Sequence, residues 1–145
     1  MRRYSVLFAV FFALGLAARP ALAADGAKTA DKPAKPGTSV DMPILVAPMS
    51  VDGRLIAYAY ISSTVVTASA AAAIDVRSKT PFIQDAFIRD VNGASIVDPK
   101  DTSKVDRPAL QARLLEDVRK AVGAGKAVSL QFSALQVTRL RPAGS

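Results

Sequence analysis

The chain has 145 residues, with 19 Lys and Arg, 12 Asp and Glu, no His and no Cys, which gives a formal net charge of +7 and suits a single domain. The absence of Cys excludes disulfide scaffolds, thiol nucleophiles and metal sites built on thiolates. The absence of His removes the commonest general base and the commonest metal ligand, so most classes of enzyme are disfavoured and no cofactor is expected.

Residues 1–23 have the three parts of an export signal. Arg2-Arg3 is a positive start, Tyr4–Ala18 is an apolar stretch, and Ala21-Leu22-Ala23 is a small-x-small cleavage site. The apolar stretch has 15 residues, fewer than the roughly 20 that a helix needs to cross a bilayer core. The pattern therefore favours a cleaved signal peptide and places the chain in the periplasm.

Cleavage is predicted between Ala23 and Ala24. The alternative is an uncleaved signal anchor on the periplasmic side of the inner membrane, because Arg19-Pro20 weakens the cleavage region. Without residues 1–23 the chain keeps 16 basic and 12 acidic residues, a net charge of +4, and it has no clusters of aromatic and basic residues. Nucleic acid is therefore not expected as a partner.

The next segment, residues 24–39, is small, charged and rich in Pro and Gly, which predicts a flexible polar linker. The folded domain is predicted over residues 40–142. It begins with an apolar strand, Met42–Met49, whose two prolines place it at a sheet edge. Asp52-Gly53 then predicts a type I′ hairpin turn.

The stretch Arg54–Thr67 is rich in β-branched and aromatic residues and predicts a long strand. Its alternation puts one set of apolar side chains on each face, so we expect a central strand that helices cover on one side. The first set is Ile56, Tyr58 and Tyr60, and the second is Leu55, Ala57, Ala59 and Ile61.

Residues Ala68–Val91 predict one broken helix or two short ones. Thr80 is the expected N-cap with Pro81 at the first helical position, and Asn92-Gly93 the expected left-handed stop. The apolar stripe of this helix is Phe82, Ile83, Phe87, Ile88 and Val91. We expect this stripe to be core, and a partner surface only if one side exceeds what the sheet covers.

A polar loop, Ser95–Arg107, leads to a further helix that Asp106 is expected to cap, with Pro108 in its first turn and Gly123–Gly125 after its end. Its apolar stripe is Leu110, Leu114, Leu115, Val118 and Val122. The last strand, Ala127–Leu140, changes its alternation near Ala134, which predicts a β-bulge there.

The order strand, strand, helix, helix, strand predicts an α+β fold: a small antiparallel sheet of about three strands with two helices packed on one face. No catalytic constellation accompanies it. Without His, a Ser–Lys pair would be needed, and Ser78-Lys79 are adjacent and not at the required spacing. The carboxylates resemble no metal loop, and Gly123–Lys126 follows a helix, opposite to the order of a phosphate-binding loop.

These elements together resemble the FliL family of flagellar basal-body-associated proteins. The resemblance covers about Val40–Arg141 and rests on the order of elements, on a P-x-I-x-D-A-x-I helix and on a final strand with a central Phe. The matching residues are Pro81, Ile83, Asp85, Ala86, Ile88 and Phe132. The resemblance implies a periplasmic domain similar to the stomatin-like (SPFH) fold, with no catalytic residues to carry over. The family normally retains a membrane anchor, from which the predicted cleavage site departs.

The first functional hypothesis is therefore a non-enzymatic exported scaffold, FliL-like, that associates with a membrane complex such as the flagellar motor and its stator, supports motility and forms a homo-oligomer. The alternative is a periplasmic carrier or binding module for a small apolar ligand or another membrane protein, which the apolar faces of Arg54–Thr67 suggest. A hydrolase that uses Ser and Lys or carboxylates is the third and least favoured hypothesis.

Overall fold

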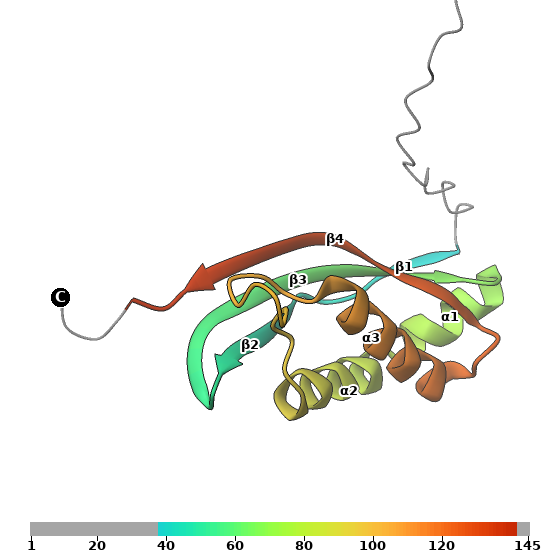
Figure 1. Cartoon of the computed structure of the whole chain (residues 1–145). Helices are drawn as coiled ribbons and strands as arrows, with labels where there is room; N and C mark the ends of the chain where they lie inside the picture. The colour runs from blue at the N-terminus through green and yellow to red at the C-terminus, as the bar shows by residue number, and fades with distance from the viewer. Residues whose placement is uncertain (1–37, 142–145) are drawn as a thin grey trace, which may run out of the picture. The chain divides into compact units, whose positions relative to one another are not determined.

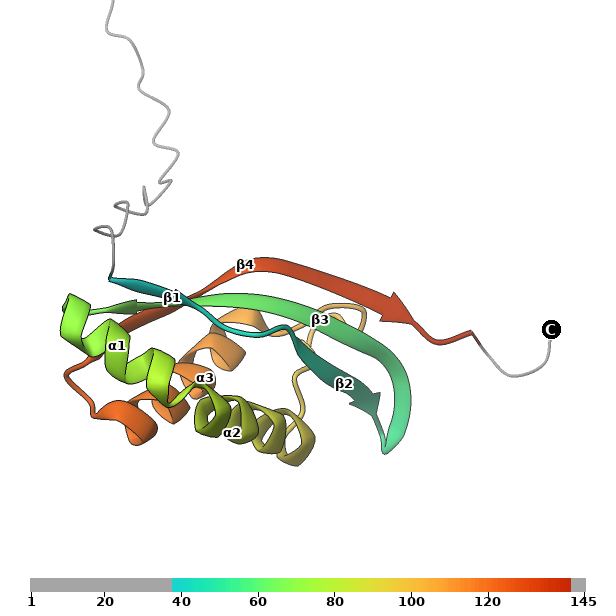
Figure 2. The same cartoon turned by 180° about the vertical axis from the view of Figure 1, so that it is seen from behind.

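A computed structural model describes residues 38–141 of the chain. Four strands and three helices follow one another in the order β1 to β3, α1 to α3, β4. Their bounds are β1 Ser39–Asp41, β2 Leu45–Val51, β3 Arg54–Thr67, α1 Ala70–Ser78, α2 Thr80–Gly93, α3 Arg107–Val122 and β4 Ala127–Arg139. All three helices lie on one face of the antiparallel sheet, as Figures 1 and 2 show from opposite sides. The predicted α+β class is confirmed, with one strand and one helix more than the expected count.

The long strand β3 is the centre of the sheet. Strand β4 pairs with it antiparallel from Ala57 to Thr67, and β1 and β2 pair with its other side at different stretches. The two short strands therefore lie end to end along one edge, and β4 forms the other edge. The predicted first strand corresponds to β2, the second of the two strands on this edge. Between β1 and β2 the edge stays bonded to β3 through the Met42 amide, which donates to the Ser63 carbonyl at 2.8 Å.

The alternation predicted for β3 is confirmed along most of its length. Ala57, Ala59 and Ile61 are buried beneath the helices, whereas Tyr58 and Tyr60 lie on the other face. Leu55 is the exception because it is 38% exposed. A register irregularity between Met49 and Ser50 of β2 leaves Ile56 without a partner, so Leu55 pairs with the exposed Ser50 and lies on the same side as that residue.

Both special features of the edge strands are as predicted. In the β2–β3 turn Asp52 has a φ of 50° and Gly53 a φ of 75°, the two positive values that a type I′ turn requires. In β4 the register shifts where Ser133 has no partner, between the pairs Ser62–Ala134 and Ser63–Phe132. This is the bulge expected near Ala134.

The segment 68–91 forms two helices, separated at Lys79. Pro81 explains the break, since it has no amide hydrogen and its ring would collide with the carbonyl four residues earlier. The predicted N-cap is wrong: Lys79 occupies that position, and the Thr80 hydroxyl instead donates to the Val76 carbonyl at 3.1 Å. The predicted left-handed stop is also wrong, because Gly93 is the last helical residue and the backbone becomes extended at Ala94.

The apolar stripe predicted for α2 divides between core and surface. Ile83, Phe87 and Val91 are buried, whereas Phe82 is 72% exposed and Ile88 is 46% exposed. The expectation that the whole stripe is core is therefore wrong for two of its five members. A helix turns by about 100° per residue, so five apolar positions spread over 82–91 cannot all face one sheet.

Helix α3 follows its prediction closely. The Asp106 side chain accepts a hydrogen bond from the Ala109 amide at 3.2 Å, and Gly123 ends the helix with a φ of 109°. The buried members of its stripe are Leu110, Leu114, Val118 and Val122, with Leu115 packed against the core from its margin. Among residues 38–141, no helix is both long enough and apolar enough to cross a membrane.

Candidate partner-binding surfaces

The outer side of α2 exposes Phe82 although the same helix buries Phe87. The two positions differ by five residues, about 140° around the helix axis. With Phe87 completely buried against the sheet, Phe82 projects to solvent at 72% exposure. This phenyl ring is the most exposed large apolar side chain in the described part of the chain.

A second apolar position lies on the flank of α2 that faces β2. The Gln84 side chain donates from Nε2 to the Ile44 carbonyl at 3.4 Å, which places the segment before β2 beside this flank. Ile88 follows Gln84 by one helical turn and so lies on the same flank. Ile44 is 62% exposed and Ile88 is 46% exposed, so two branched apolar side chains border this contact in solvent.

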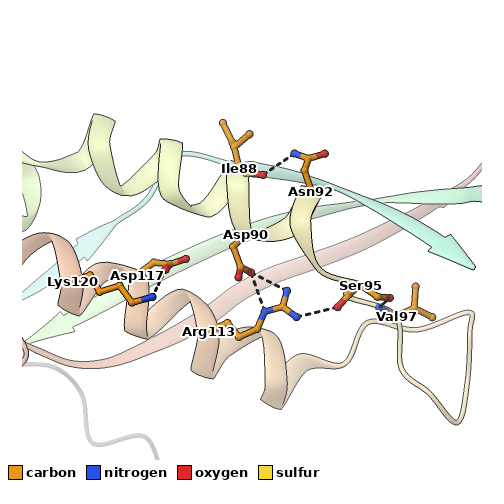
Figure 3. A network of polar contacts seen from close by, with 8 residues as sticks. All are labelled: Ile88, Asp90, Asn92, Ser95, Val97, Arg113, Asp117 and Lys120. Atoms are coloured by element: carbon orange, nitrogen blue, oxygen red, sulfur yellow. Dashed lines mark hydrogen bonds and ion pairs between the residues drawn. The ribbon is translucent and has the colours of Figure 1, made fainter. Parts of the chain in front are cut away.

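The opposite flank of α2 is joined to α3 by a charged pair (Figure 3). Arg113 donates from Nε and Nη2 to Oδ2 of Asp90, at 3.0 and 2.9 Å, and from Nη1 to the Ser95 carbonyl at 3.0 Å. Both side chains are largely buried, with 30% and 20% of their surfaces exposed. One guanidinium therefore ties two helices and the following loop together, which is a structural function.

Asp117 lies on α3 near this pair (Figure 3). Burial raises the pKa of its carboxyl, and the charge of Asp90 raises it further, against the opposing effect of a hydrogen bond from Lys120 at 3.4 Å. Its Oδ2 atom is buried without a hydrogen-bond partner. An open hollow of about 400 Å³ lies beside both carboxylates. Asp90 is already occupied by Arg113, and residues 38–141 contain no group of three or more ligands that could hold a metal ion.

Three further carboxylates, Asp85, Asp98 and Asp101, lie on the surface of α2 and in the loop before α3. Asp85 pairs with Arg89 on the surface of α2. In the loop before α3, hydrogen bonds from Lys104 and Ser103 hold the pKa of Asp101 well below its usual range. Asp98 accepts from the Lys100 amide at 2.7 Å. Asp98 and Asp101 thus order their own loop, and the three carboxylates do not line a common hollow.

The candidate hydroxyl nucleophiles bond to a carboxylate or to the backbone and not to a lysine. The Thr64 hydroxyl donates to Asp41 across the sheet at 2.7 Å, and the Ser78 hydroxyl donates to the Asp75 carbonyl at 2.8 Å. Lys79, next to Ser78, donates instead to the Ala121 carbonyl at 2.6 Å. Lys126, after the glycines that end α3, pairs with Asp75, and its hydrogen bond and charge lower the pKa of that carboxyl. No Ser–Lys pair forms among these residues.

A third candidate surface lies at the hairpin end of the sheet. An open hollow of about 540 Å³ lies between the β2–β3 turn and the end of β4. Its apolar lining is Val51, Leu55, Ile56 and Leu140, and its charged lining is Asp52, Arg54 and Arg141. A smaller hollow of about 140 Å³ adjoins it through Ile56. Its lining includes Val137 and Arg139 of β4 and Thr102 and Ser103 of the loop before α3. We call these two hollows and their linings the hairpin-end surface.

No sequence signal marked the hairpin-end surface beyond the turn itself. Its residues come from the two ends of the domain, and only antiparallel pairing of β3 with β4 brings them together.

The predicted signal cleavage site, Ala23 and Ala24, lies outside the described residues. No protein-family model matches the chain, and no curated protein matches it.

Proposed function

We propose that the chain is a non-enzymatic, FliL-like module that is exported to the periplasm, binds a membrane protein complex such as the flagellar stator, and supports motility. The observation that supports this proposal most directly is the exposed phenyl ring of Phe82, at 72% exposure, on the helix that carries the FliL-like pattern. Aromatic side chains are enriched in protein interfaces, and exposing one in water brings no gain in folding energy.

The position of the pattern residues strengthens the argument. Pro81 lies at the start of α2 and Ile83 is buried in the core, so these two residues serve the fold. Ile88, the last member of the pattern, is exposed beside Ile44. The helix thus has more apolar surface than the sheet covers, which is the condition that distinguishes a partner surface from core.

The proposed location depends on the export signal. We expect cells to contain a species that begins at Ala24, which intact-mass measurement on separated periplasmic and membrane fractions would detect. A full-length species in the membrane fraction would instead support the signal-anchor alternative, in which the domain is held on the periplasmic side of the inner membrane. A full-length species in the cytoplasmic fraction would contradict export altogether.

The motility function is tested in a deletion strain of the source bacterium. We expect deletion to reduce swimming and the wild-type gene to restore it. Phe82→Asp should fail to restore swimming, whereas Arg89→Gln, an exposed change on the same helix, should restore it. Affinity purification should recover stator proteins with the wild type and with Arg89→Gln only. Normal swimming of the deletion strain, together with no recovery of stator proteins, would contradict the proposal.

One observation favours the alternative, a carrier of a small apolar ligand. The larger hollow of the hairpin-end surface, about 540 Å³, has a volume within the range of ligand pockets, roughly 300–1,000 Å³, and four of its seven lining residues are apolar. Mass spectrometry of organic extracts from natively purified protein tests this alternative. A lipid or metabolite recovered in stoichiometric amount from the wild type and not from Leu55→Asp would support it.

A further inference from the structure

The outer edge of β4 has two parts, and the first is covered by α3. Gln111 donates from Nε2 to the Leu130 carbonyl at 3.1 Å. Arg119 donates from Nε to the Ala127 carbonyl at 3.2 Å and from Nη2 to the Val128 carbonyl at 3.4 Å. Side chains of the helix thus occupy the carbonyls that this part of the edge directs away from β3.

Beyond the bulge at Ser133 the edge is open. The Leu140 amide donates to the Ile56 carbonyl of β3 at 3.0 Å. Along a strand in an antiparallel sheet, the backbone groups of successive residues point alternately to one neighbouring strand and to the other. Counting back from Leu140, every second residue therefore bonds to β3. The residues between them direct their backbone amides and carbonyls away from β3. The outward-directed residues are Leu135, Val137 and Arg139. Within residues 38–141, β4 pairs with no strand other than β3.

Edge strands are usually protected by a charged residue or a proline, and the open edge has only one such residue, Arg139 at its end. Residues 134–138 contain neither. The other edge of the sheet carries Pro48, which lies opposite Tyr58 of β3. The backbone groups of Tyr58 bond to β4, so the backbone nitrogen of Pro48 points to solvent. Because proline has no amide hydrogen, this position cannot donate to an added strand. One edge is therefore blocked against strand addition and the other is not.

Three unpaired cations lie at the end of the open edge. Arg139 belongs to the edge itself, and Arg54 and Arg141 line the larger hollow next to it. None of the three forms an ion pair with a described residue. Asp52 is the only acid in the lining of either hollow, so the hairpin-end surface is net positive around an apolar floor.

We propose that the open edge of β4 binds an extended segment of a partner protein that carries acidic residues and adds to the sheet as a further strand. This inference rests on the proposed function, a protein-binding module, and specifies the chemistry of the partner. The backbone groups of Leu135, Val137 and Arg139 supply the hydrogen bonds. The arginines receive carboxylates, and the apolar floor formed by Leu55 and Leu140 receives an aliphatic side chain.

Charge argues against a second copy of this chain as the occupant. Pairing two β4 edges would bring Arg139 and Arg141 of both copies to one interface, and this part of β4 contains no acidic residue to neutralise them. Uncompensated like charges across an interface oppose association. An acidic segment removes this cost and forms the same backbone hydrogen bonds.

The test uses the chain as recovered from cells, labelled with ¹⁵N, and two blocked octapeptides as probes. One peptide alternates Val with Glu and the other alternates Val with Lys. We expect the Glu peptide to slow amide hydrogen exchange at Leu135, Val137 and Arg139, and to bind about tenfold more tightly than the Lys peptide at low salt.

Variants separate the backbone contribution from the charge contribution. Val137→Pro removes an outward amide without removing a bond to β3, and we expect it to abolish peptide binding. The double variant Arg139→Glu with Arg141→Glu should weaken the Glu peptide by about tenfold. Arg107→Glu changes an unpaired basic residue outside both hollows and should bind within about twofold of wild type.

Several results would overturn the inference. The inference fails if the Glu peptide leaves exchange at the three amides unchanged, or if both peptides bind equally. It also fails if the chain forms a concentration-dependent dimer that protects the same amides without peptide. Binding to phosphatidylglycerol vesicles with no protection of these amides would contradict it as well. If the peptide fails while Phe82→Asp still abolishes recovery of stator proteins, only this inference falls. If the peptide binds and stator proteins are not recovered, this inference stands and the proposed stator partner falls.

Discussion

Helices α2 and α3 are alike on the side that faces the sheet and different on the other side. Both begin with a proline in the first turn, and both bury apolar side chains at one-turn intervals. Both helices carry surface ion pairs, Glu116–Arg119 on α3 and Asp85–Arg89 on α2, but only α2 also exposes large apolar side chains, Phe82 and Ile88. Similar contributions to the core thus accompany different surfaces, and the apolar surface of α2 is the one that the fold leaves unexplained.

The two helices also start differently. Asp106 caps α3 with its side chain, but Lys79 makes no side-chain bond at the start of α2. Helix α2 instead follows α1 directly, and the Lys79 carbonyl accepts from the Phe82 and Ile83 amides at 3.0 Å each. The first turn of α2, which displays Phe82, is therefore held by backbone bonds and packing. The predictions below test how far this division between fold and surface holds.

The largest effect is expected for Phe87→Ala. Removing this fully buried ring should lower the free energy of unfolding by about 3–5 kcal/mol, because it leaves a cavity beneath the sheet. Phe82→Ala, the matched change on the same helix, should alter stability by less than about 0.5 kcal/mol. Urea denaturation measures both. A comparable loss for the two variants would show that Phe82 also serves the fold and would remove the argument for a partner surface.

The next effect concerns the pair that joins the two helices. Arg113→Ala should cost about 1–3 kcal/mol, since it leaves the largely buried Asp90 carboxylate and the Ser95 carbonyl without their donors. Arg113→Lys keeps the charge but cannot donate in the same forked geometry, so it should recover only part of the loss. Thermal unfolding of both variants measures this. Full recovery by Lys would mean that charge alone matters.

The difference between the helix starts predicts a smaller effect. Asp106→Ala should lower stability by about 1 kcal/mol through loss of the N-cap. Lys79→Ala removes only an exposed contact to the Ala121 carbonyl and should change stability by less than about 0.5 kcal/mol. Chemical denaturation at neutral pH compares them. The contrast between the two helix starts would fail if Lys79→Ala were the more damaging change.

The smallest effect is a pH dependence at Asp117 of α3, beside Asp90 of α2. Burial raises the pKa of Asp117, so the folded state binds this proton more tightly than the unfolded state. The contribution of Asp117 to stability therefore falls as the pH rises through a window that begins near the ordinary Asp pKa, about 3.9. Asp117→Asn cannot ionise and should be more stable than wild type at pH 7, by less than about 1 kcal/mol. The difference should shrink towards pH 4, and a difference that grows on acidification would contradict the cause given.

Much of the fold could be predicted because its signals are local. The positive φ values at Asp52 and Gly53, the cap at Asp106 and the bulge near Ala134 each depend on a few neighbouring residues. The local signals failed at Thr80, because its hydroxyl donates back to the Val76 carbonyl of the preceding helix and α2 begins at Lys79 without a side-chain cap. They also failed at Gly93, because a glycine can end a helix without adopting a left-handed conformation.

The candidate surfaces were less accessible to prediction. The sequence indicated that the apolar stripe of α2 is core or partner surface, but not which of its residues are buried. Phe82 and Phe87 are chemically identical and differ only in the direction in which they project from the helix. The hairpin-end surface gave no signal of its own, since Arg54 and Arg139 are far apart in the chain.

The sequence by itself determined the order of the elements after the short strand β1, the α+β class, the edge position of the proline-bearing strand and the lack of His and Cys chemistry, because each follows from residue type and short-range spacing. Only the tertiary structure decided which side of α2 meets the sheet, which part of β4 is covered by α3, and which arginines lie together around an apolar hollow. These features depend on packing between segments that are distant in the chain. Whether a side chain is buried is decided by the neighbours that pack against it and not by the side chain itself.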